Sequence, residues 1–207
     1  MKEVVNMVRD ETEKYNQIMT AAAALFAKQG YKKTTVDEIV VGAAISKGLF
    51  YHYFKNKKEL YLHLYNTYVD ILSNTIRQKV DLSEADFFLR LKQLAYIRLN
   101  FFLEYPNLWG FLYSAYYESH TDIEPLIKEK NSTLLKAAYS GSAADIDWSK
   151  LKKGMTPDKA IEIVTWLAEG FMRKRPESSN IPNKELFNQF DEYMECLKTG
   201  LYELRKE

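Results

Sequence analysis

The chain has 207 residues, of which 46% are hydrophobic and 28% are charged, and its formal net charge is +1. This composition supplies enough apolar side chains for a buried core and excludes disorder of the whole chain. A single cysteine excludes an internal disulfide, and no stretch approaches the roughly 20 apolar residues of a membrane span, so we expect a soluble cytoplasmic protein with no membrane partner.

The small net charge hides an uneven distribution of charged residues. Residues 27–60 hold seven lysines against three acidic residues, whereas residues 61–207 hold 19 lysines and arginines against 21 acidic residues. The sequence therefore predicts a basic head on a mildly acidic body, rather than a basic coat for nucleic acid.

The first predicted element is an amphipathic helix, because apolar side chains recur at three- and four-residue steps from Tyr15 to Phe26. Gly30 has the residue type and position of a helix stop, so we expect this helix to span about 18 residues. Thr35 then provides an N-cap hydroxyl, and Glu38 follows at the spacing of a capping box. A short second helix is predicted to begin after Thr35.

A third short helix is predicted to begin after Ser46, a favourable N-cap residue, and to end near Phe54. Its inner side is expected to carry Leu49, Phe50 and Phe54. Asn56 then caps a longer fourth helix. The expected inner face of that helix consists of Leu60, Leu64, Tyr68 and Ile71.

Helical periodicity continues through the rest of the chain. A long helix follows the segment DLSEAD and ends before Pro106, which disfavours helical geometry in the residue that precedes it. Further helices are expected over residues 107–119, 122–140 and 157–175, and a last one from residue 183. No segment alternates as a strand would, so the predicted fold class is all-α.

Two short helices joined by a tight turn form a helix-turn-helix, which places its second helix in the major groove of DNA. The exposed part of that helix is expected to carry Lys47, Gly48, Tyr51 and His52. Tyrosine and histidine donate hydrogen bonds to phosphate oxygens and press their rings against sugars or thymine methyl groups. Lysine reaches phosphate or a guanine edge, and glycine allows close approach of the DNA backbone.

Two further residues are predicted to contact phosphate. Lys57 follows the Asn56 cap, where a helix amino terminus and a lysine charge point at the same place, and Thr35 begins the second helix in a similar way. The complete predicted DNA-binding set is Thr35, Ser46, Lys47, Gly48, Tyr51, His52 and Lys57. In the competing interpretation, Tyr51 and His52 merely cover the small domain and Lys57 is a solvated lysine.

The stretch AAAALFAKQGYKKTTVDEIVVGAAISKGLFYHYFKNKKELY, residues 21–61, resembles the DNA-binding domain of the TetR (tetracycline repressor) family of bacterial transcriptional regulators. The resemblance covers roughly the first quarter of the chain. The matching features are Leu25, Phe26, Gly30, Tyr31, Thr34, Thr35, Val36, Ile39, Ala43, Ser46, Lys47, Gly48, Tyr51, His52, Tyr53, Phe54, Lys57, Glu59 and Leu60.

Two residues depart from the family pattern. Ala44 stands in the turn where the family commonly has glycine, and a positive φ there would cost alanine about 1 kcal/mol. Asp37 places a carboxylate where many relatives carry a basic or polar group, so we do not expect it to contact phosphate.

The resemblance implies a DNA-binding domain over residues 1–56 and a larger helical domain over residues 57–207 for ligand binding and dimerisation. It implies a homodimer, a palindromic double-stranded operator and a small-molecule effector that changes the spacing of the two heads. Recognition helices must meet major-groove faces about 34–36 Å apart, so a modest rotation abolishes the fit. The effector acts only if it prefers one head spacing over the other.

Aromatic residues of the body are candidates for the wall of an apolar ligand cavity, although ordinary core packing is the alternative. This set is Tyr96, Phe101, Tyr105, Trp109, Tyr113, Tyr116, Trp166 and Phe171. The last two helices carry apolar residues suited to a symmetric four-helix interface, with packing inside one chain as the alternative. These residues are Val164, Leu167, Phe171, Phe190, Tyr193, Leu197 and Leu204.

The sequence offers little support for an enzyme. Its three histidines and Cys196 lack metal-ligand spacing, and no nucleotide-binding or nucleophile-elbow motif occurs, so neither a metal nor a cofactor is expected. The predicted function is a ligand-responsive DNA-binding regulator, a repressor that leaves its operator when an apolar or amphipathic molecule binds. The alternative is a helical ligand-binding or protein-interaction module without sequence-specific DNA binding.

Overall fold

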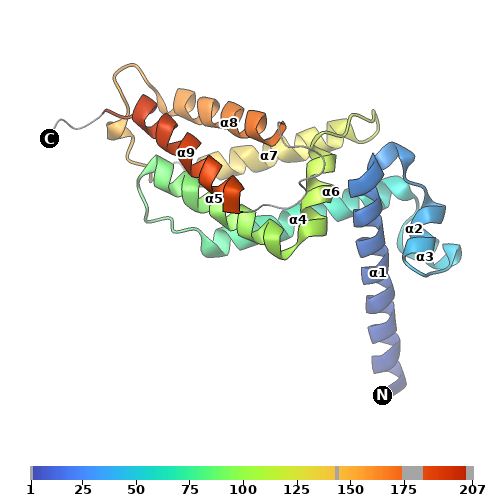
Figure 1. Ribbon diagram of the computed structural model, residues 1–207. Helices are drawn as coiled ribbons and strands as arrows, with labels where there is room; N and C mark the ends of the chain where they lie inside the picture. Colours follow the sequence, from blue (N-terminus) through green and yellow to red (C-terminus); the bar gives the residue numbers. More distant parts are fainter. Residues whose placement is uncertain (1, 143–144, 174–183, 204–207) are drawn as a thin grey trace. The chain divides into compact units, whose positions relative to one another are not determined.

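A computed structural model describes residues 2–142, 145–173 and 184–203 (Figure 1). The helices are α1 (Lys2–Lys33), α2 (Val36–Gly42), α3 (Lys47–Tyr53), α4 (Lys57–Lys79), α5 (Phe87–Glu104), α6 (Pro106–Tyr116), α7 (Glu124–Ser142), the 3-10 turn η1 (Trp148–Lys150), α8 (Pro157–Arg173) and α9 (Lys184–Leu201). The described residues contain no strand beyond one isolated bridge between Leu151 and Tyr202. The all-α prediction is confirmed.

The helices divide into two compact units. Unit 1 comprises Met1–Ser73 and Tyr105–Leu135, and unit 2 comprises Asn74–Glu104 and Lys136–Glu207. The first part of α4 therefore packs with α1 to α3, together with α6 and the beginning of α7. This division by packing differs from the predicted division by function at residues 56 and 57, which stays a prediction.

The core of unit 1 is built on aromatic rings. Helix α1 packs against α2 and α6. Phe26 of α1, Tyr61 of α4 and Phe111 of α6 are fully buried in this core. The Tyr61 ring meets the Phe26 ring edge-to-face with centroids 4.8 Å apart and the Phe111 ring at 5.2 Å. Each such buried ring contributes about 1.5–3 kcal/mol through removal of apolar surface from water. This core holds α2 and α3 against α1.

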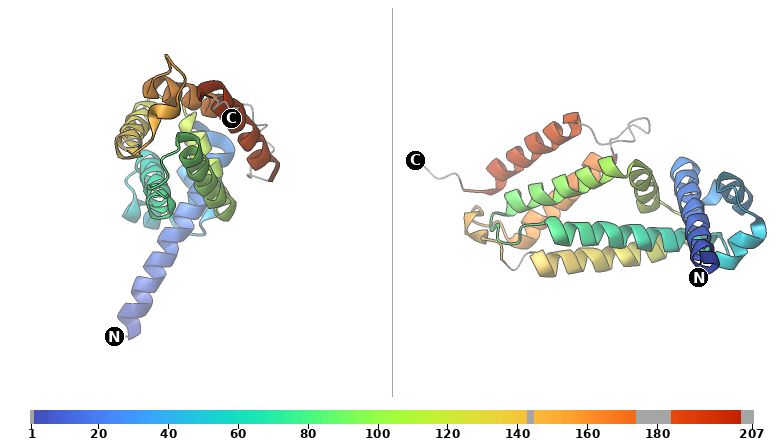
Figure 2. Two further views of the ribbon diagram at one scale, coloured as in Figure 1. Left: turned by 90° about the vertical axis from the view of Figure 1, so that its left-hand side faces the viewer. Right: turned by 90° about the horizontal axis from the view of Figure 1, so that it is seen from below.

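Helix α1 is longer than predicted and is kinked where the sequence indicated a stop. It begins at Lys2, and its amino-terminal turns extend well beyond α2 and α3 (Figures 1 and 2). The segment before Tyr15 contains lysines, glutamates and an arginine, which are good helix formers. At Gly30 the backbone leaves helical geometry with φ 74°, a conformation that favours glycine. Gly30 therefore breaks the helix as a kink, whereas the helical segment resumes beyond it and ends at Lys33.

The predicted caps of the short helices are confirmed. Thr35 Oγ1 accepts a hydrogen bond from the Glu38 N–H at 3.2 Å, and the Glu38 carboxylate accepts one from the Thr35 N–H at 2.8 Å. Ser46 Oγ accepts one from the Leu49 N–H at 3.1 Å. Each cap satisfies donors that a helix start leaves without a partner.

Helix α4 begins as predicted, because Asn56 Oδ1 accepts a hydrogen bond from the Glu59 N–H at 2.9 Å. Leu60 and Leu64 are fully buried, as expected for the inner face. The expectation for Ile71 is wrong, since this side chain is 44% exposed. The apolar spacing along one helix does not show where the neighbouring helices cease to cover it.

Unit 2 has its own core, formed by α5, α8, α9 and the loop that contains η1. The buried side chains of this core are Phe87, Phe88, Ile146, Leu151, Ala160, Met194, Leu201 and Tyr202. Helix α5 packs against α9, and the Phe88 ring meets the Tyr202 ring edge-to-face at 5.1 Å.

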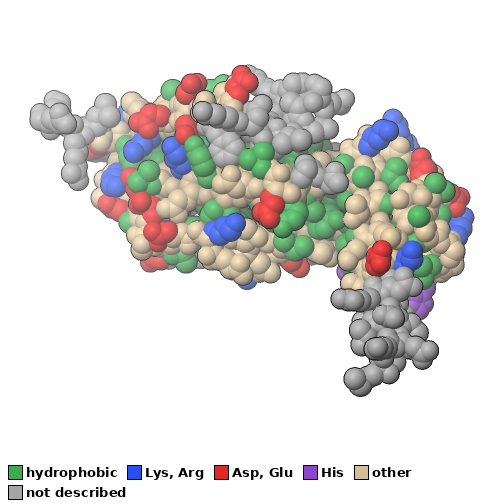
Figure 3. Space-filling model, turned by 60° about the horizontal axis from the view of Figure 1, so that its bottom comes forward, with side chains coloured by type: hydrophobic (Ala, Val, Ile, Leu, Met, Phe, Trp, Pro, Cys, Tyr) green, Lys and Arg blue, Asp and Glu red, His purple; other side chains and the backbone are tan. Residues whose placement is uncertain are grey.

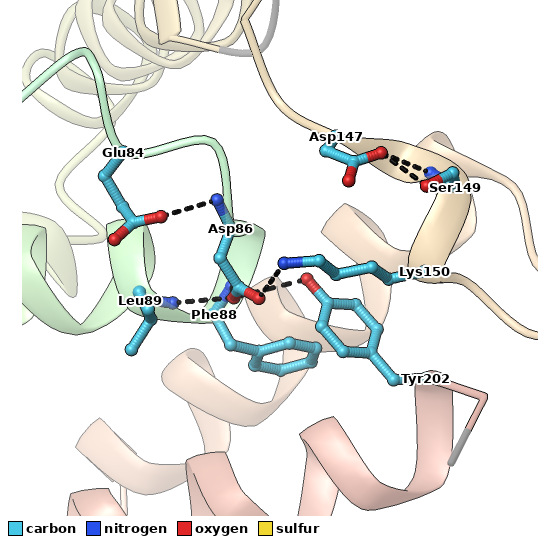
Figure 4. Close-up of polar contacts among 8 residues, drawn as sticks. All are labelled: Glu84, Asp86, Phe88, Leu89, Asp147, Ser149, Lys150 and Tyr202. Carbon is cyan, nitrogen blue, oxygen red and sulfur yellow. Dashed lines mark hydrogen bonds and ion pairs between the residues drawn. The ribbon is translucent and has the colours of Figure 1, made fainter. Parts of the chain in front are cut away.

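A buried carboxylate joins three segments of unit 2 (Figure 4). Asp86 is 6% exposed and accepts hydrogen bonds from the N–H groups of Phe88 and Leu89 at the start of α5. Its carboxylate also meets the Lys150 ammonium at 2.9 Å and accepts from the Tyr202 hydroxyl at 3.4 Å. A buried charge is tolerated when it is paired and hydrogen-bonded in this way.

Candidate nucleic-acid interface

The turn between α2 and α3 is a Schellman motif closed by an alanine. The Ile45 N–H donates to the Val40 carbonyl at 3.0 Å, and the Ala44 N–H donates to the Val41 carbonyl at 3.1 Å. Ala44 lies at φ 52°, in the left-handed region that this motif usually fills with glycine. The structure therefore shows the strained turn that the sequence indicated. The two backbone hydrogen bonds of this turn fix the position at which α3 begins.

Helix α3 divides into a buried side and an exposed side. Phe50 is fully buried and Phe54 nearly so, which fixes the helix on the core of unit 1. The exposed side presents Lys47, Gly48, Tyr51 and His52, as the helical spacing predicts. The Tyr51 side chain is half exposed, and its ring meets the Phe50 ring edge-to-face at 5.3 Å. The four residues thus lie on one exposed surface of a helix whose other side is fixed in the core.

Gly48 has no structural requirement inside the chain. A Cβ at this position would meet only Ser46 Oγ at 3.9 Å, which is an ordinary contact. Because Gly48 has no side chain, the exposed surface of α3 is lower at this position than at its neighbours. Ser46 and Thr35, which the sequence also placed in the DNA-binding set, are exposed and use their hydroxyl groups as helix caps.

Lys57 is held within unit 1. Its ammonium donates to the carbonyls of Tyr31 and Thr34, each at 2.7 Å, and lies 4.3 Å from the centre of the Tyr31 ring. Burial lowers the pKa of Lys57 below its ordinary value, against the opposing charges of Glu118 and Glu38. Because an ammonium has three N–H donors, these carbonyls leave at most one for a phosphate. Contact between Lys57 and phosphate stays a prediction.

Sequence reasoning missed the role of Glu118 in the turn after α1. Its carboxylate accepts a hydrogen bond from the Tyr31 N–H at 3.0 Å, next to the kink at Gly30. The same side chain accepts from the N–H of His120, whose ring meets the Tyr31 ring edge-to-face at 5.0 Å. Tyr31 and Glu118 lie 87 residues apart, so no local pattern could have revealed this contact.

An exposed ion pair joins α2 to α3. Asp37 Oδ1 lies 2.7 Å from the Lys47 ammonium, with side chains that are 71% and 53% exposed. The hydrogen bond and the charge of Asp37 raise the pKa of Lys47. The sequence placed Lys47 on this surface but did not predict the pair. On the face drawn in Figure 3, basic and acidic side chains are interspersed in the same manner.

The helix-turn-helix matches a known family. Residues 18–64 match the family model described as "Bacterial regulatory proteins, tetR family". This amino-terminal region is therefore similar to the DNA-binding regulators of the TetR family. The resemblance inferred from Gly30, Ser46, Tyr51 and Lys57 is thereby confirmed.

Curated TetR-type relatives match the same region. The Transposon Tn10 TetC protein of Escherichia coli is 38% identical over 71 residues, which cover 34% of this chain and 36% of TetC. The HTH-type transcriptional repressor KstR2 of Mycobacterium tuberculosis is 38% identical over 78 residues, 38% of each chain. The chain thus spans little more than a third of the length of these relatives.

Solved structures match over nearly the whole chain and show its fold. The ketosteroid transcriptional regulator KstR2 of Mycobacterium tuberculosis has a TM-score of 0.66 at 21% identity, covering 91% of this chain and 95% of its own. The SmeT–triclosan complex has a TM-score of 0.64 at 16% identity, covering 92% of both chains. At these identities the likeness extends the TetR-like fold beyond residue 64.

The predicted ligand-binding residues fall in both units. Tyr105, Trp109, Tyr113 and Tyr116 belong to unit 1, and Tyr96, Phe101, Trp166 and Phe171 belong to unit 2. Their exposure differs: Phe101 and Trp109 are buried, whereas Trp166 is 62% exposed. Tyr96 donates its hydroxyl to Asp191 at 2.6 Å, which raises its pKa to about 12. The side chain of Phe171 lies outside the described residues.

Two of the hollows in the described part of the chain are relevant to the predicted cavity. One, of about 700 Å³, is lined by side chains of α1 between Thr12 and Ala24 and by Gly42. The other, of about 310 Å³, is lined by Glu84, Leu89, Lys92, Gln93 and Tyr96. Tyr96 alone of the predicted set lines either one, so the cavity stays a prediction.

The predicted dimer residues lie on α8 and α9. Val164, Leu167, Phe190 and Leu197 are partly buried against the core of unit 2, while Tyr193 is exposed. Leu204, like the side chain of Phe171, lies outside the described residues. Packing inside one chain thus accounts for part of this set, and pairing with a second chain stays a prediction.

Proposed function

We propose that the protein is a TetR-family transcriptional regulator whose α3 enters the major groove of a DNA operator. The observation that carries this proposal is the exposed side of α3, where Lys47, Gly48, Tyr51 and His52 gather without a role in the core. The buried Phe50 and the caps at Thr35 and Ser46 set this helix rigidly, as a reading head requires.

The proposed mode of action is release by a ligand. The similarity to KstR2, named as a repressor, and to SmeT in complex with triclosan supports a repressor that responds to an apolar or amphipathic effector. The effector shifts the protein only if it binds one conformation more tightly than the other. The proposed cavity wall remains the aromatic set of α5, α6 and α8.

The proposed assembly is a homodimer that reads a palindrome. Two heads joined by a symmetry axis meet half-sites one helical turn apart, which a single head cannot do. The proposed joining surface is formed by α8 and α9, from which Tyr193 exposes a large ring. We place the protein in the bacterial cytoplasm, because a regulator meets its operator there. No described helix is long and apolar enough to span a bilayer.

Selection from a pool of random duplexes tests this function. The full-length protein is incubated with the pool at physiological salt, and retained duplexes are sequenced over successive rounds. We expect enrichment of a palindrome whose half-sites are about 10 base pairs apart, centre to centre, or a multiple of that. Weak retention that vanishes as salt rises, without any enriched sequence, would instead favour an interaction module with a nonspecific basic patch.

A further inference from the structure

The acidic residues of the helix-turn-helix differ in how their carboxylates are used. Glu38 accepts hydrogen bonds from the Thr35 N–H and from the Gln29 amide, and Glu59 accepts one from the Lys55 N–H. Both therefore work as local caps. Among the described contacts of residues 27–60, Asp37 alone pairs its carboxylate with a lysine of the exposed side of α3.

The Asp37–Lys47 pair lies on the proposed reading surface. Lys47 is the first residue of α3, and Tyr51 follows one helical turn later on the same side. Since both partners are well exposed, the pair adds little to folding stability. We therefore consider how the pair affects the contacts that Lys47 can make with DNA.

The Asp37–Lys47 pair affects a contact with a phosphate differently from a contact with a base edge. A phosphate that approaches the paired Lys47 ammonium also approaches the Asp37 carboxylate, so like-charge repulsion opposes this contact. If the ammonium leaves Asp37 for the phosphate, an unpaired carboxylate then faces the polyanion. To contact guanine O6 or N7, the ammonium uses its other N–H donors and keeps its bond to Asp37. The Asp37 carboxylate is then an acceptor for the N4 amino group of cytosine in the same groove.

We propose that Asp37 is a specificity-determining residue, which withholds Lys47 from phosphate contacts and directs it to a guanine–cytosine base pair. The inference rests on the proposed function, because it concerns how that DNA surface discriminates. Nonspecific binding consists almost entirely of phosphate contacts, so Asp37 weakens it more than it weakens operator binding. The pair thus raises the ratio of specific to nonspecific affinity.

The test compares the full-length wild type with Asp37→Asn on the selected duplex and on a scrambled duplex, over a range of salt concentrations. We expect Asp37→Asn to bind the scrambled duplex about 3- to 10-fold more tightly, and to lose that factor in specificity ratio. The slope of log affinity against log salt should steepen by about one per protomer, because Lys47 then neutralises a phosphate. In a Lys47→Met background, the same substitution should leave the salt slope unchanged, because no Lys47 ammonium is released to a phosphate.

Asp70→Asn is the matched control, because Asp70 is also an exposed carboxylate paired with a lysine, Lys130, in unit 1 but outside α2 and α3. It should leave the specificity ratio and the salt slope unchanged. If Asp37→Asn behaves like this control while the wild type still selects an operator, the role of Asp37 is refuted and the proposed function stands. If the wild type selects no operator, the proposed function itself fails.

Discussion

The helix-turn-helix and the core of unit 2 are both held by polar contacts, but these contacts span very different distances along the chain. Around α2 and α3 the caps join residues three apart, as between Thr35 and Glu38. In unit 2, Asp86 meets Lys150 64 residues away and Tyr202 116 residues away. Local contacts leave a readable signature in sequence, and distant ones do not. The contrast explains which features could be predicted.

Removal of the distant contact should have the largest effect on stability. Asp86→Ala takes away the cap of α5 and leaves the Lys150 ammonium and the Tyr202 hydroxyl without their acceptor, so we expect a loss of about 2–4 kcal/mol in the free energy of unfolding. Urea denaturation measures it. Asp81→Ala is the control, because the Asp81 carboxylate is exposed and accepts hydrogen bonds only from nearby Ser83 among its described contacts. This substitution should cost less than about 1 kcal/mol. Equal losses would contradict the comparison.

The same carboxylate predicts a dependence of stability on pH. Burial opposes ionisation of Asp86, but the hydrogen bonds from Lys150 and the Leu89 N–H outweigh it, and the pKa of Asp86 lies below its ordinary value. Its contribution is therefore present above the unfolded pKa of about 3.9 and is lost as pH falls through the lower folded pKa. Denaturation at a series of acid pH values should show a steeper decline for the wild type than for Asp86→Asn. Parallel profiles would refute this account.

Within the helix-turn-helix, Lys57 is an exception to the short range of the polar contacts. Its ammonium binds carbonyls 23 and 26 residues away along the chain. Lys57→Met removes the donor to two carbonyls at the end of α1, those of Tyr31 and Thr34. We expect a loss of about 1–2 kcal/mol of unfolding free energy. Lys58→Met removes the same charge one residue later and should change stability by less than about 0.5 kcal/mol. If the two variants are equally stable, Lys57 does not hold the end of α1, and its ammonium is available to phosphate.

The smallest effect is expected at Ala44, where a local rule is broken. Ala44→Gly relieves the left-handed strain, which costs alanine roughly 1–2 kcal/mol, but it increases the entropy of the unfolded chain. We expect a net gain of about 0.5–1 kcal/mol in thermal or urea unfolding. Gly30→Ala, at φ 74°, is the reciprocal variant and should destabilise the protein. A destabilised Ala44→Gly would show that the turn carries no such strain.

Much of the head was predictable because its signals lie close together. Thr35, Ser46 and Asn56 each satisfy a helix start within three residues, and the exposed residues of α3 follow from its 3.6-residue period. The strain at Ala44 was likewise predicted from a missing glycine. The Asp37–Lys47 pair was not, because its partners belong to different helices and meet only after the turn sets their angle.

The body was predictable only as a set of helices. Its aromatic residues could be identified, but burial depends on which helices cover them, as the exposed Trp166 and the buried Trp109 show. The period of an isolated helix indicates the side on which a residue lies, but not which other helix packs against that side. For the same reason the exposure of Ile71 was missed, and the buried Asp86 had no signal that distinguished it from other carboxylates.

The most direct test of the central claim is the affinity of Tyr51→Ala for the selected duplex and for a scrambled duplex, measured by fluorescence anisotropy beside the wild type. If α3 reads the groove, the variant should bind the selected duplex about 10- to 100-fold more weakly and the scrambled duplex with little change. Leu126→Ala, an exposed apolar residue of α7 in the same unit, should leave both affinities unchanged. A Tyr51→Ala variant that binds both duplexes as the wild type does would contradict the account.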